Sequence, residues 1–368
     1  MKARHLLYVD DVETQRVLFR DAVREWNEAN PEKEFTFDLA ESFEEGIAAL
    51  GRTRFDGALF DLRLPSPGPG RTERPLGNEL AQVGLHEFGI PVAIISGKPD
   101  EVDPDLANSS TVKIVDKGDG DGFANAVSWF GTLWPMLEAM SLARARIREV
   151  SAGLFADRIW PAWKSYVSMA EGKDLTPVLA RQYVWHLGEV MGAGSGKDDD
   201  LWHPLEAWIC PPLYADRAST GDILTQDDEL WVILTPPCDL ANAGKVENVL
   251  LAHCSRSLPA DWVAVLEKCA HADAGRREKG WDRIRKLFNQ PEQAVHYLPP
   301  LPDEHLPVTV EFSHLRTLSM AEIEKALGNR IGSVTAPFIS NLIQRFGAYM
   351  SRVGQPNLNA KAFPQNGQ

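Results

Sequence analysis

The chain has 368 residues, 44% of them hydrophobic and 24% charged, an ordinary composition for a globular protein of two or three domains. Its net charge of −14 argues against broad nonspecific binding to nucleic acid or an anionic membrane, and leaves a local basic patch open. No apolar run approaches about 18 residues and no signal peptide is recognised, so we expect a cytoplasmic protein without membrane spans. The cysteines of such a protein are expected to be reduced thiols: Cys210, Cys238, Cys254 and Cys269.

The first third of the chain alternates short apolar runs with segments of helical periodicity. The runs are, in order, HLLYVD, FTFDLA, FDGALFD, PVAIIS and TVKIVDK. Helix-like segments cover residues 12–30, 42–50, 77–88 and 123–134. Five strand–helix units of this kind predict a doubly wound α/β fold with a parallel sheet over residues 1–135. Such sheets bind their ligands at the carboxyl ends of the strands.

Polar residues with distinctive chemistry collect at those carboxyl ends. Asp10 and Asp11 close the first run, and Asp61 closes the third. Ser96 and Lys117 close the fourth and fifth. Carboxylates gathered at one sheet edge repel each other unless a cation holds them, and oxygen ligands suit Mg²⁺. A lysine and a hydroxyl can then hold the oxygens of a phosphoryl group on Asp61.

The patterns YVDD, FDLRLP, IISG and VDK, in this order, resemble the response-regulator receiver domain. The resemblance implies that Asp10 and Asp11 form the acidic pair of a Mg²⁺ site and that Asp61 is the phosphoacceptor. It implies as well that the backbone carbonyl of Arg63 completes the metal site. Members of this family take a phosphoryl group from a histidine kinase and change their surface in response.

The same resemblance gives Ser96 the role of sensing the phosphoryl group and Lys117 the role of pairing with it. The sequence departs from the family at three places. Gly118 stands where a proline is usual, and Ile114 stands where many members carry an aromatic switch residue. A Pro/Gly-rich loop at 66–75 is inserted beside the phosphoacceptor, either as surface decoration or as a partner-specific lid.

Residues 136–198 are expected to form a helical connector. Helices are predicted at 136–150, 154–171 and 175–192, and the flexible, acidic stretch GAGSGKDDD marks a boundary at 192–200. Aromatic residues are frequent in this segment and favour a core or a dimer interface over a ligand site: Trp160, Trp163, Tyr166, Tyr183 and Trp185.

Residues 199–368 are predicted to form an α+β output domain on a small, strongly bent sheet or barrel. Two β-like runs flank a turn at 226–228, and VENVLLAHC and LPVTVEF supply further strands. A helical insertion is expected at 261–288, and 320–352 reads as mostly helical. The run GDIL…ELWVILTPPCDL resembles the opening of the MazF/PemK toxin barrels over about one hairpin. It brings no catalytic set with it, so no RNase activity is expected.

Two kinds of cysteine site are conceivable in the second half. Cys238 and Asp239 follow a strand, where Cys238 would be a nucleophile with His253 or His271 as its base; a buried thiol and a turn aspartate are favoured instead. A zinc site would combine cysteine and histidine but lacks paired CxxC spacing. Its candidate ligands are Cys238, His253, Cys254, Cys269 and His271.

Two further groups of residues are candidates for contact with a partner. A basic cluster either contacts phosphates or is the solvated face of a helix, which is favoured: Arg276, Arg277, Lys279, Arg283, Arg285 and Lys286. A second group on the last helix either docks a partner or closes the core of the output domain: Arg345, Phe346, Tyr349 and Arg352.

The sequence therefore predicts a two-component response regulator in which a histidine kinase or GHKL-type ATPase phosphorylates Asp61. The receiver then controls the C-terminal module, and the protein forms a homodimer in one version of this hypothesis. The architecture also resembles receivers of bacterial conflict and antiphage loci. Two alternatives stay open: a receiver-gated effector enzyme, nuclease-like or cysteine-dependent, and a scaffold that is not phosphorylated. A regulatory phosphoacceptor is preferred over an enzyme.

Overall fold

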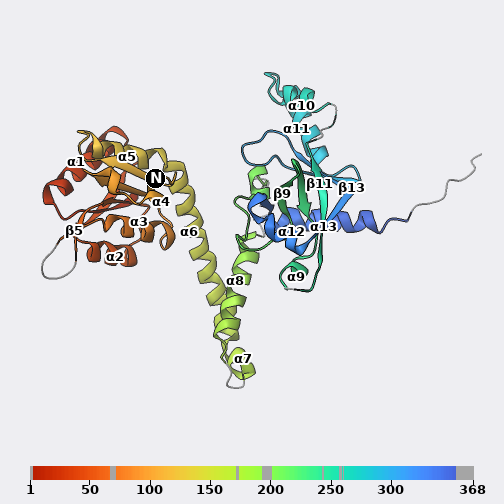
Figure 1. Cartoon of the computed structure of the whole chain (residues 1–368), viewed down its shortest axis with the longest axis horizontal. Coiled ribbons are helices and arrows are strands. Elements are labelled where there is room, and N and C mark those ends of the chain that lie inside the picture. Colours follow the sequence, from red (N-terminus) through yellow and green to blue (C-terminus); the bar gives the residue numbers. More distant parts are fainter. Residues whose placement is uncertain are drawn as a thin grey trace, which may run out of the picture. The chain divides into compact units, whose positions relative to one another are not determined.

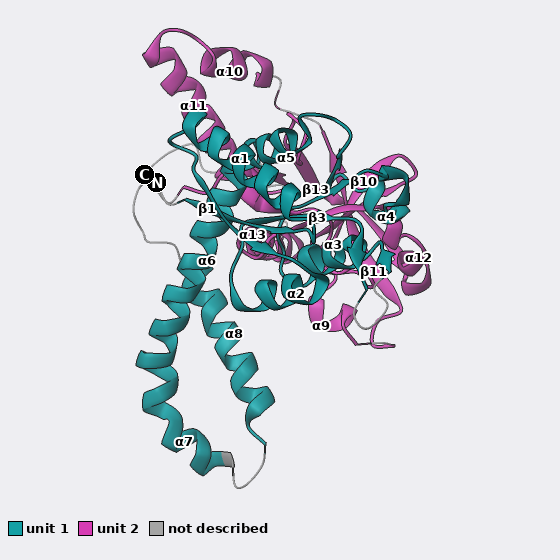
Figure 2. Cartoon of the chain, turned by 90° about the vertical axis from the view of Figure 1, so that its left-hand side faces the viewer, with its two compact units in different colours: residues 1–195 teal, residues 196–368 magenta. Residues whose placement is uncertain are grey.

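A computed structural model of the chain describes residues 3–66, 72–170, 174–192, 201–242, 244–256, 259 and 261–353. The chain divides into two compact units: unit 1 is residues 1–195 and unit 2 is residues 196–368 (Figure 2). The predicted boundary at 192–200 lies, beyond Gly192, outside the described residues. The helices expected to form a connector belong to unit 1.

The sheet of unit 1 has five parallel strands in the order β2-β1-β3-β6-β7. Each apolar run predicted as a strand forms one of them. Their bounds are β1 Arg4–Val9, β2 Phe35–Ala40, β3 Gly57–Asp61, β6 Val92–Ser96 and β7 Val112–Asp116. Numbered along the chain, this is the 2-1-3-4-5 order of a doubly wound fold, which confirms the predicted fold class.

Helices cover both faces of this sheet (Figure 1). α1 (Glu13–Ala29) and α5 (Gly122–Thr132) pack on one face, and α2 (Phe43–Arg52) and α3 (Gly77–His86) on the other. In α1 the buried side chains recur every three or four residues, at Arg16, Phe19 and Val23. This spacing places them on the stripe of the helix that faces the strands.

The crossover between β6 and β7 is shorter than the others. It contains a 3₁₀ turn at Pro99–Glu101 and a single turn of helix, α4 (Pro104–Ala107). Two prolines within six residues leave no room for a long helix, because proline is tolerated only in the first turn. Strands β4 (Leu64–Pro65) and β5 (Glu73–Arg74) pair at the base of the inserted loop, of which residues 67–71 lie outside the described part.

Three further helices complete unit 1. α6 (Trp134–Leu154) continues through a π-helical turn at Phe155–Ile159 into α7 (Trp160–Ala170), and α8 (Thr176–Gly192) lies beside α6 (Figure 2). The Tyr183 hydroxyl on α8 donates to the carbonyl of Ser151 at 2.8 Å. Trp160 and Trp185 are 64% and 71% exposed, so they do not belong to the core of this unit. No helix in the described ranges is long and apolar enough to cross a membrane.

Unit 2 is built on a seven-stranded antiparallel sheet, in the order β12-β13-β11-β10-β9-β14-β8. With its surrounding helices it confirms an α+β domain. The predicted hairpin turn is present, since Asp227 and Asp228 have φ of 54° and 63°, the positive values that a tight two-residue turn requires. The strands are β8 Trp208–Ile209, β9 Asp222–Gln226, β10 Glu229–Ile233, β11 Asn248–Ser255, β12 Val295–Leu298, β13 Val308–Ser319 and β14 Arg330–Val334.

Side chains of this sheet alternate between two apolar clusters. Val232 and Ala252 face the side covered by α13 (Ala336–Met350), whereas Trp231 and Leu251 face the side of α12 (Met320–Lys325). Both faces are therefore covered, at least in part, by helices.

The segment 320–352 is mostly helical, as predicted, but its middle contains a strand. Between α12 and α13 the chain forms a 3₁₀ turn (Leu327–Asn329) and then β14, which inserts between β9 and β8. Arg330 and Ser333 of β14 both bind Asp222 of β9, a long-range interaction that local periodicity does not reveal. The helical insertion forms as two helices, α10 (Trp262–Cys269) and α11 (Ala274–Phe288). A short helix, α9 (Pro237–Leu240), follows β10.

Candidate functional site

The carboxyl ends of four adjacent strands in unit 1 meet at one edge of the sheet. Val9 pairs with Phe60, so Asp10 directly after β1 lies level with Asp61 at the end of β3. Ser96 ends β6, and Lys117 directly follows β7. The topology thus brings together residues that are up to 107 positions apart in the chain.

The carboxylates at this edge are close enough to share one cation. Single oxygens of Asp10, Asp11 and Asp61 all lie within 4.8 Å of one another, with Asp10 and Asp61 buried and Asp11 exposed. The Lys117 ammonium lies 2.8 Å from Asp10 Oδ2 and 3.0 Å from Asp61 Oδ1. Three carboxylates thus face one ammonium, and this excess of hard oxygen donors fits a divalent cation such as Mg²⁺.

The pKa values record this imbalance. Burial raises the pKa of Asp61 to about 6; Lys117 opposes the shift, and the charge of Asp10 adds to it. Burial and the charge of Asp10 also raise the pKa of Asp11. The pKa of Lys117 is raised in spite of burial, because Asp61 and Asp10 stabilise its charge. Asp61 is therefore a carboxylate whose negative charge is only partly compensated.

Side chains that the sequence did not single out hold Asp10 in place. The Tyr8 hydroxyl donates to Asp10 Oδ2 at 2.6 Å, and the Val12 amide donates to Oδ1 at 2.8 Å. Arg16 donates to the Asp10 carbonyl at 2.7 Å. Burial raises the pKa of Tyr8, so its phenol remains a donor. Tyr8 stands two residues before Asp10, and this strand spacing places both on one face, a signal that was available in the sequence.

Ser96 and Arg63 have partners of their own at this edge. Ser96 is 2% exposed, and its hydroxyl accepts from the Lys98 amide at 2.9 Å. The amide of Arg63 donates to Asp61 and lowers its pKa. The Arg63 side chain turns away to a bidentate pair with Glu101, at 2.6 and 2.7 Å. Glu101 lies in the short β6–β7 crossover, so this pair ties that crossover to the residue two positions after Asp61.

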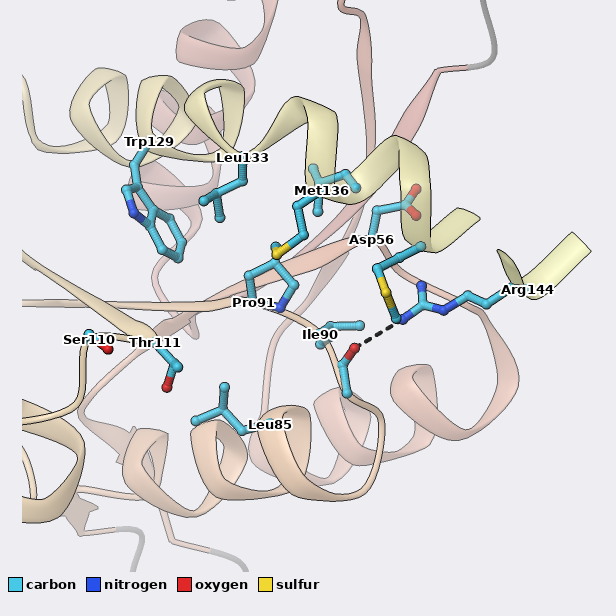
Figure 3. A pocket seen from close by; sticks show the side chains of 13 residues that line it. Asp56, Leu85, Ile90, Pro91, Ser110, Thr111, Trp129, Leu133, Met136 and Arg144 are labelled. Carbon is cyan, nitrogen blue, oxygen red and sulfur yellow. Dashed lines mark hydrogen bonds between the residues drawn. The ribbon is translucent and has the colours of Figure 1, made fainter. Parts of the chain in front are cut away.

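An apolar cavity of about 380 Å³ lies at the opposite, amino end of the same sheet (Figure 3). Pro91 and Thr111, which precede β6 and β7, form its floor, and Trp129 and Met136 line it from the helical side. Arg144 closes one end by donating to the carbonyl of Gly89 at 2.9 Å. The cavity is separate from the acidic cluster. It lies between α6 and the amino edge of the sheet.

The cysteine hypotheses for unit 2 find no support in the geometry. The Cys238 thiol contacts Asp239, and the Asp239 carboxylate pairs with Lys245. Cys254 is fully buried, and burial raises the pKa of its thiol. Among the described residues, the clusters of close metal-ligating side chains contain His253 but none of Cys238, Cys254, Cys269 and His271. The favoured buried thiol is also wrong for Cys238, which is exposed.

The other two groups are engaged within unit 2. In the basic cluster, Arg283 pairs with Asp261, and Arg285 pairs with Glu278 and Asp282. These exposed ion pairs agree with the prediction that the basic cluster is the solvated face of a helix. On α13, Phe346 and Tyr349 pack against Phe312 in the core at ring distances of 5.6 and 5.7 Å. Arg345 donates to the carbonyl of Val295 at 3.1 Å, and Arg352 stacks on Tyr349.

The comparisons with known proteins found matches among solved structures. No protein-family model matches the chain, and no curated protein matches it. The signal receiver domain of a putative LuxO repressor protein from Vibrio parahaemolyticus is 14% identical, with a TM-score of 0.30; the match covers 39% of this chain and 98% of that one. A CheY-like receiver domain protein from Methanospirillum hungatei is 17% identical at a TM-score of 0.28, covering 38% and 99%.

A third neighbour is the response regulator TrrA from Thermotoga maritima, in complex with Mg²⁺ and BeF, at 18% identity and a TM-score of 0.26. That match covers 34% of this chain and 96% of TrrA. Five parallel strands in the order 2-1-3-4-5, with helices on both faces, define a doubly wound fold in this chain. The N-terminal part of this chain has the fold of a response-regulator receiver domain.

Proposed function

We propose that unit 1 is a working receiver whose Asp61 accepts a phosphoryl group from a histidine kinase or a GHKL-type ATPase partner, and that unit 2 is the output or partner-binding module. One observation carries the proposal. The Asp61 carboxylate is buried at a strand end, 3.0 Å from Lys117 and beside Asp10 and Asp11, with its charge incompletely compensated. A structural carboxylate would be fully paired in such a place.

The chemistry follows from the positions of the side chains. A carboxylate oxygen of Asp61 attacks the phosphorus of a phosphohistidine, the P–N bond breaks, and the histidine nitrogen leaves with the bond electrons and takes up a proton. The product is an acyl phosphate on Asp61. Lys117 pairs with a phosphoryl oxygen, and the Ser96 hydroxyl provides a second polar contact. Mg²⁺ held by Asp10, Asp11, Asp61 and the Arg63 carbonyl would neutralise charge on the transferred group.

We further propose that the chain acts as a homodimer through α6, α7 and α8. These helices expose several large apolar side chains, among them Trp160, Met169 and Trp185 at 64%, 80% and 71%. Apolar exposure of this extent on neighbouring helices is typical of an interaction surface. The resemblance in architecture to receiver proteins of conflict loci makes antiviral defence the setting in which this regulation would operate.

The test is intact-mass analysis after incubation with Mg²⁺ and acetyl phosphate, on wild type and Asp61→Ala. We expect a gain of one phosphoryl group in wild type that requires Mg²⁺ and is absent in the variant. Asp38→Ala is the matched control, because Asp38 is an exposed aspartate of the same sheet, and it should be phosphorylated like wild type.

Beryllofluoride and light scattering complete the experiment by following oligomeric state with and without this stable mimic. A change of mass with beryllofluoride in wild type, absent in Asp61→Ala, links the site to assembly. Equal masses for wild type and Asp61→Ala in the phosphorylation assay, with no response to beryllofluoride, would contradict the proposal and favour the scaffold alternative.

A further inference from the structure

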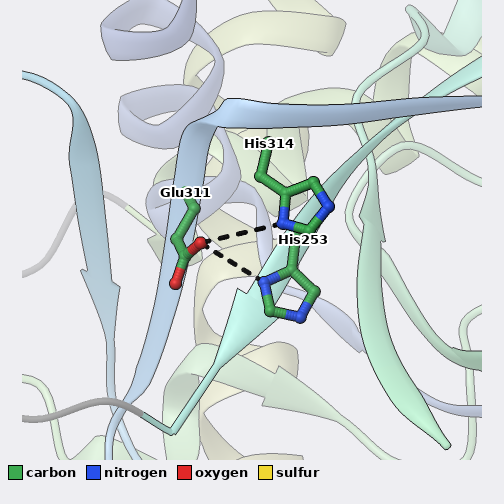
Figure 4. Close-up of side chains that lie close together, drawn as sticks. All are labelled: His253, Glu311 and His314. Carbon is green, nitrogen blue, oxygen red and sulfur yellow. Dashed lines mark hydrogen bonds and ion pairs between the residues drawn. The ribbon is translucent and has the colours of Figure 1, made fainter.

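The sheet of unit 2 brings two histidines and a glutamate together on one face. His253 lies on β11, and Glu311 and His314 lie on β13. One ligand atom from each lies within 4.8 Å of the other two. Figure 4 shows both imidazole rings turned toward the same carboxylate oxygen of Glu311. His253 is a residue that the sequence suggested as a zinc ligand, but its companions are not the cysteines.

A break in strand register creates this cluster. Side chains alternate along a regular strand, so residues three apart, such as Glu311 and His314, point to opposite faces. Here Ala252 pairs with Leu315, whereas the next residue, His253, pairs with Glu311. The extra residues on β13 form a bulge, and Figure 4 shows the ribbon turning between Glu311 and His314. The bulge therefore brings His314 to the side of Glu311.

The distances within the cluster are long for direct pairing. Glu311 Oε2 lies 3.4 Å from His253 Nδ1 and 3.9 Å from His314 Nδ1. By contrast, the Arg330–Asp222 pair of the same unit is 2.9 Å long. Ligand atoms bound to a tetrahedral Zn²⁺ at ~2.1 Å are about 3.4 Å apart. His253 and Glu311 share one long hydrogen bond, and the same spacing fits an ion bound between the three groups.

The surroundings fix the rings on one side and leave the other side open. Trp231 pairs with His253 across β10 and β11, and its indole lies 5.3 Å from each imidazole, edge to face. Trp231 is 3% exposed, so it forms a buried wall on this side of the rings. The side chain of His314 is 52% exposed, so an ion can enter from solvent.

We propose that His253, Glu311 and His314 bind a divalent transition-metal ion of the Zn²⁺ type. Imidazole with one carboxylate suits such ions, whereas Mg²⁺ prefers oxygen ligands alone. Three protein ligands leave one position of a tetrahedral ion for water or for an oxygen atom of a substrate. This site lies in unit 2, belongs to a different ion class from the acidic cluster, and does not depend on phosphorylation of Asp61.

The test is calorimetric titration of Zn²⁺ into the full chain, stripped of metal and held in excess Mg²⁺ so that the acidic cluster is occupied. We expect one Zn²⁺ per chain in wild type. His314→Ala and Glu311→Gln should each weaken binding by more than about 100-fold, since loss of outer-shell partners alone costs about 10–100-fold. Both side chains are partly exposed, and circular dichroism checks that the variants fold.

The matched control is His305→Ala, an exposed histidine outside the cluster, which should bind Zn²⁺ like wild type. Titration with Co²⁺ separates these ligands from cysteine, because thiolate coordination adds intense near-ultraviolet charge-transfer bands that nitrogen and oxygen ligands do not give. Absence of those bands supports the proposal. Their presence, equal affinity in wild type, His314→Ala and Glu311→Gln, or no uptake by wild type would each overturn it.

Discussion

Both units bury an aspartate beside a basic side chain, but they compensate its charge differently. In unit 2, Asp222 is fully buried and accepts from Arg330 at 2.9 Å and from Ser333 at 2.5 Å. Arg330 also donates to the carbonyls of Ala215 and Arg217, at 3.0 and 2.7 Å. One carboxylate meets one guanidinium, and several of their remaining hydrogen-bonding positions are filled from the backbone.

In unit 1, Asp61 shares Lys117 with Asp10, and Asp11 adds a further negative charge. Burial raises the pKa of Asp61, and the shared Lys117 offsets this shift only in part. Asp61 and Asp222 are both buried, so burial alone does not mark a functional carboxylate. A buried carboxylate that lacks its full complement of positive charge is available to a cation or an incoming phosphoryl group.

The largest expected effect comes from breaking the compensated pair. Asp222→Ala leaves the guanidinium of Arg330 buried without its carboxylate and should lower the unfolding free energy of unit 2 by about 3–5 kcal/mol. Urea denaturation followed by tryptophan fluorescence measures the loss. Asp216→Ala, at an exposed position nearby, should leave the midpoint unchanged. An equally small shift in both variants would mean that the pair does not hold β14 against β9.

A smaller loss of stability is expected from a substitution at Gly77, which packs against the backbone of Asp61. Gly77 begins α3, and a Cβ atom added there would lie 2.3 Å from the carbonyl oxygen of Asp61 and 2.6 Å from the Cα of Leu62. Gly77→Ala must therefore displace the end of β3, which should cost about 1–3 kcal/mol. It should also slow phosphorylation, because the carboxylate moves relative to Lys117.

The matched control for Gly77→Ala is Gly51→Ala, near the end of α2, where an added Cβ meets nothing within 4 Å. This control should stabilise the helix by up to about 1 kcal/mol. Thermal unfolding of both variants, together with the rate of phosphoryl uptake, makes the comparison. If Gly77→Ala behaves like Gly51→Ala in both measurements, close packing of α3 does not position Asp61.

Much of unit 1 could be predicted because its pattern is local. Each parallel strand is a short apolar run, and the residue that follows it must lie at the carboxyl edge of the sheet. Asp10, Asp61 and Lys117 could therefore be assigned to one edge before any coordinates. The short β6–β7 crossover was not anticipated, and neither was the pair between Arg63 and Glu101, which joins residues 38 positions apart.

Less of unit 2 can be predicted from the sequence, because its decisive contacts depend on the register between strands. β14 is a five-residue strand, too short for periodicity to separate it from a helix, and its partner Asp222 lies 108 positions earlier. His253 and Glu311 face each other only because the register shifts at Ala252. The sequence offers no local sign of that bulge, and it suggests other companions for His253, namely three cysteines and His271.

The smallest expected effect tests whether the charge at Asp61 is costly to the fold in the absence of metal. Burial raises the pKa of Asp61 to about 6, above its ordinary value of 3.8. The folded state therefore binds more protons than the unfolded state between these values. The unfolding free energy of wild type should fall as pH rises through about 6. Asp61→Asn removes this loss and should be more stable than wild type at about pH 8, by on the order of 1 kcal/mol.

Thermal unfolding of wild type and Asp61→Asn between about pH 5 and pH 8 measures this difference. The advantage of Asp61→Asn should shrink toward the acidic end, where wild type is itself protonated. Asp38→Asn, which removes an exposed carboxylate, should show no such trend. Added Mg²⁺ should raise the melting temperature of wild type more than that of Asp61→Asn, because only wild type keeps all three carboxylates. A variant less stable than wild type throughout would mean that Lys117 compensates Asp61 fully, and the contrast with Asp222 would then disappear.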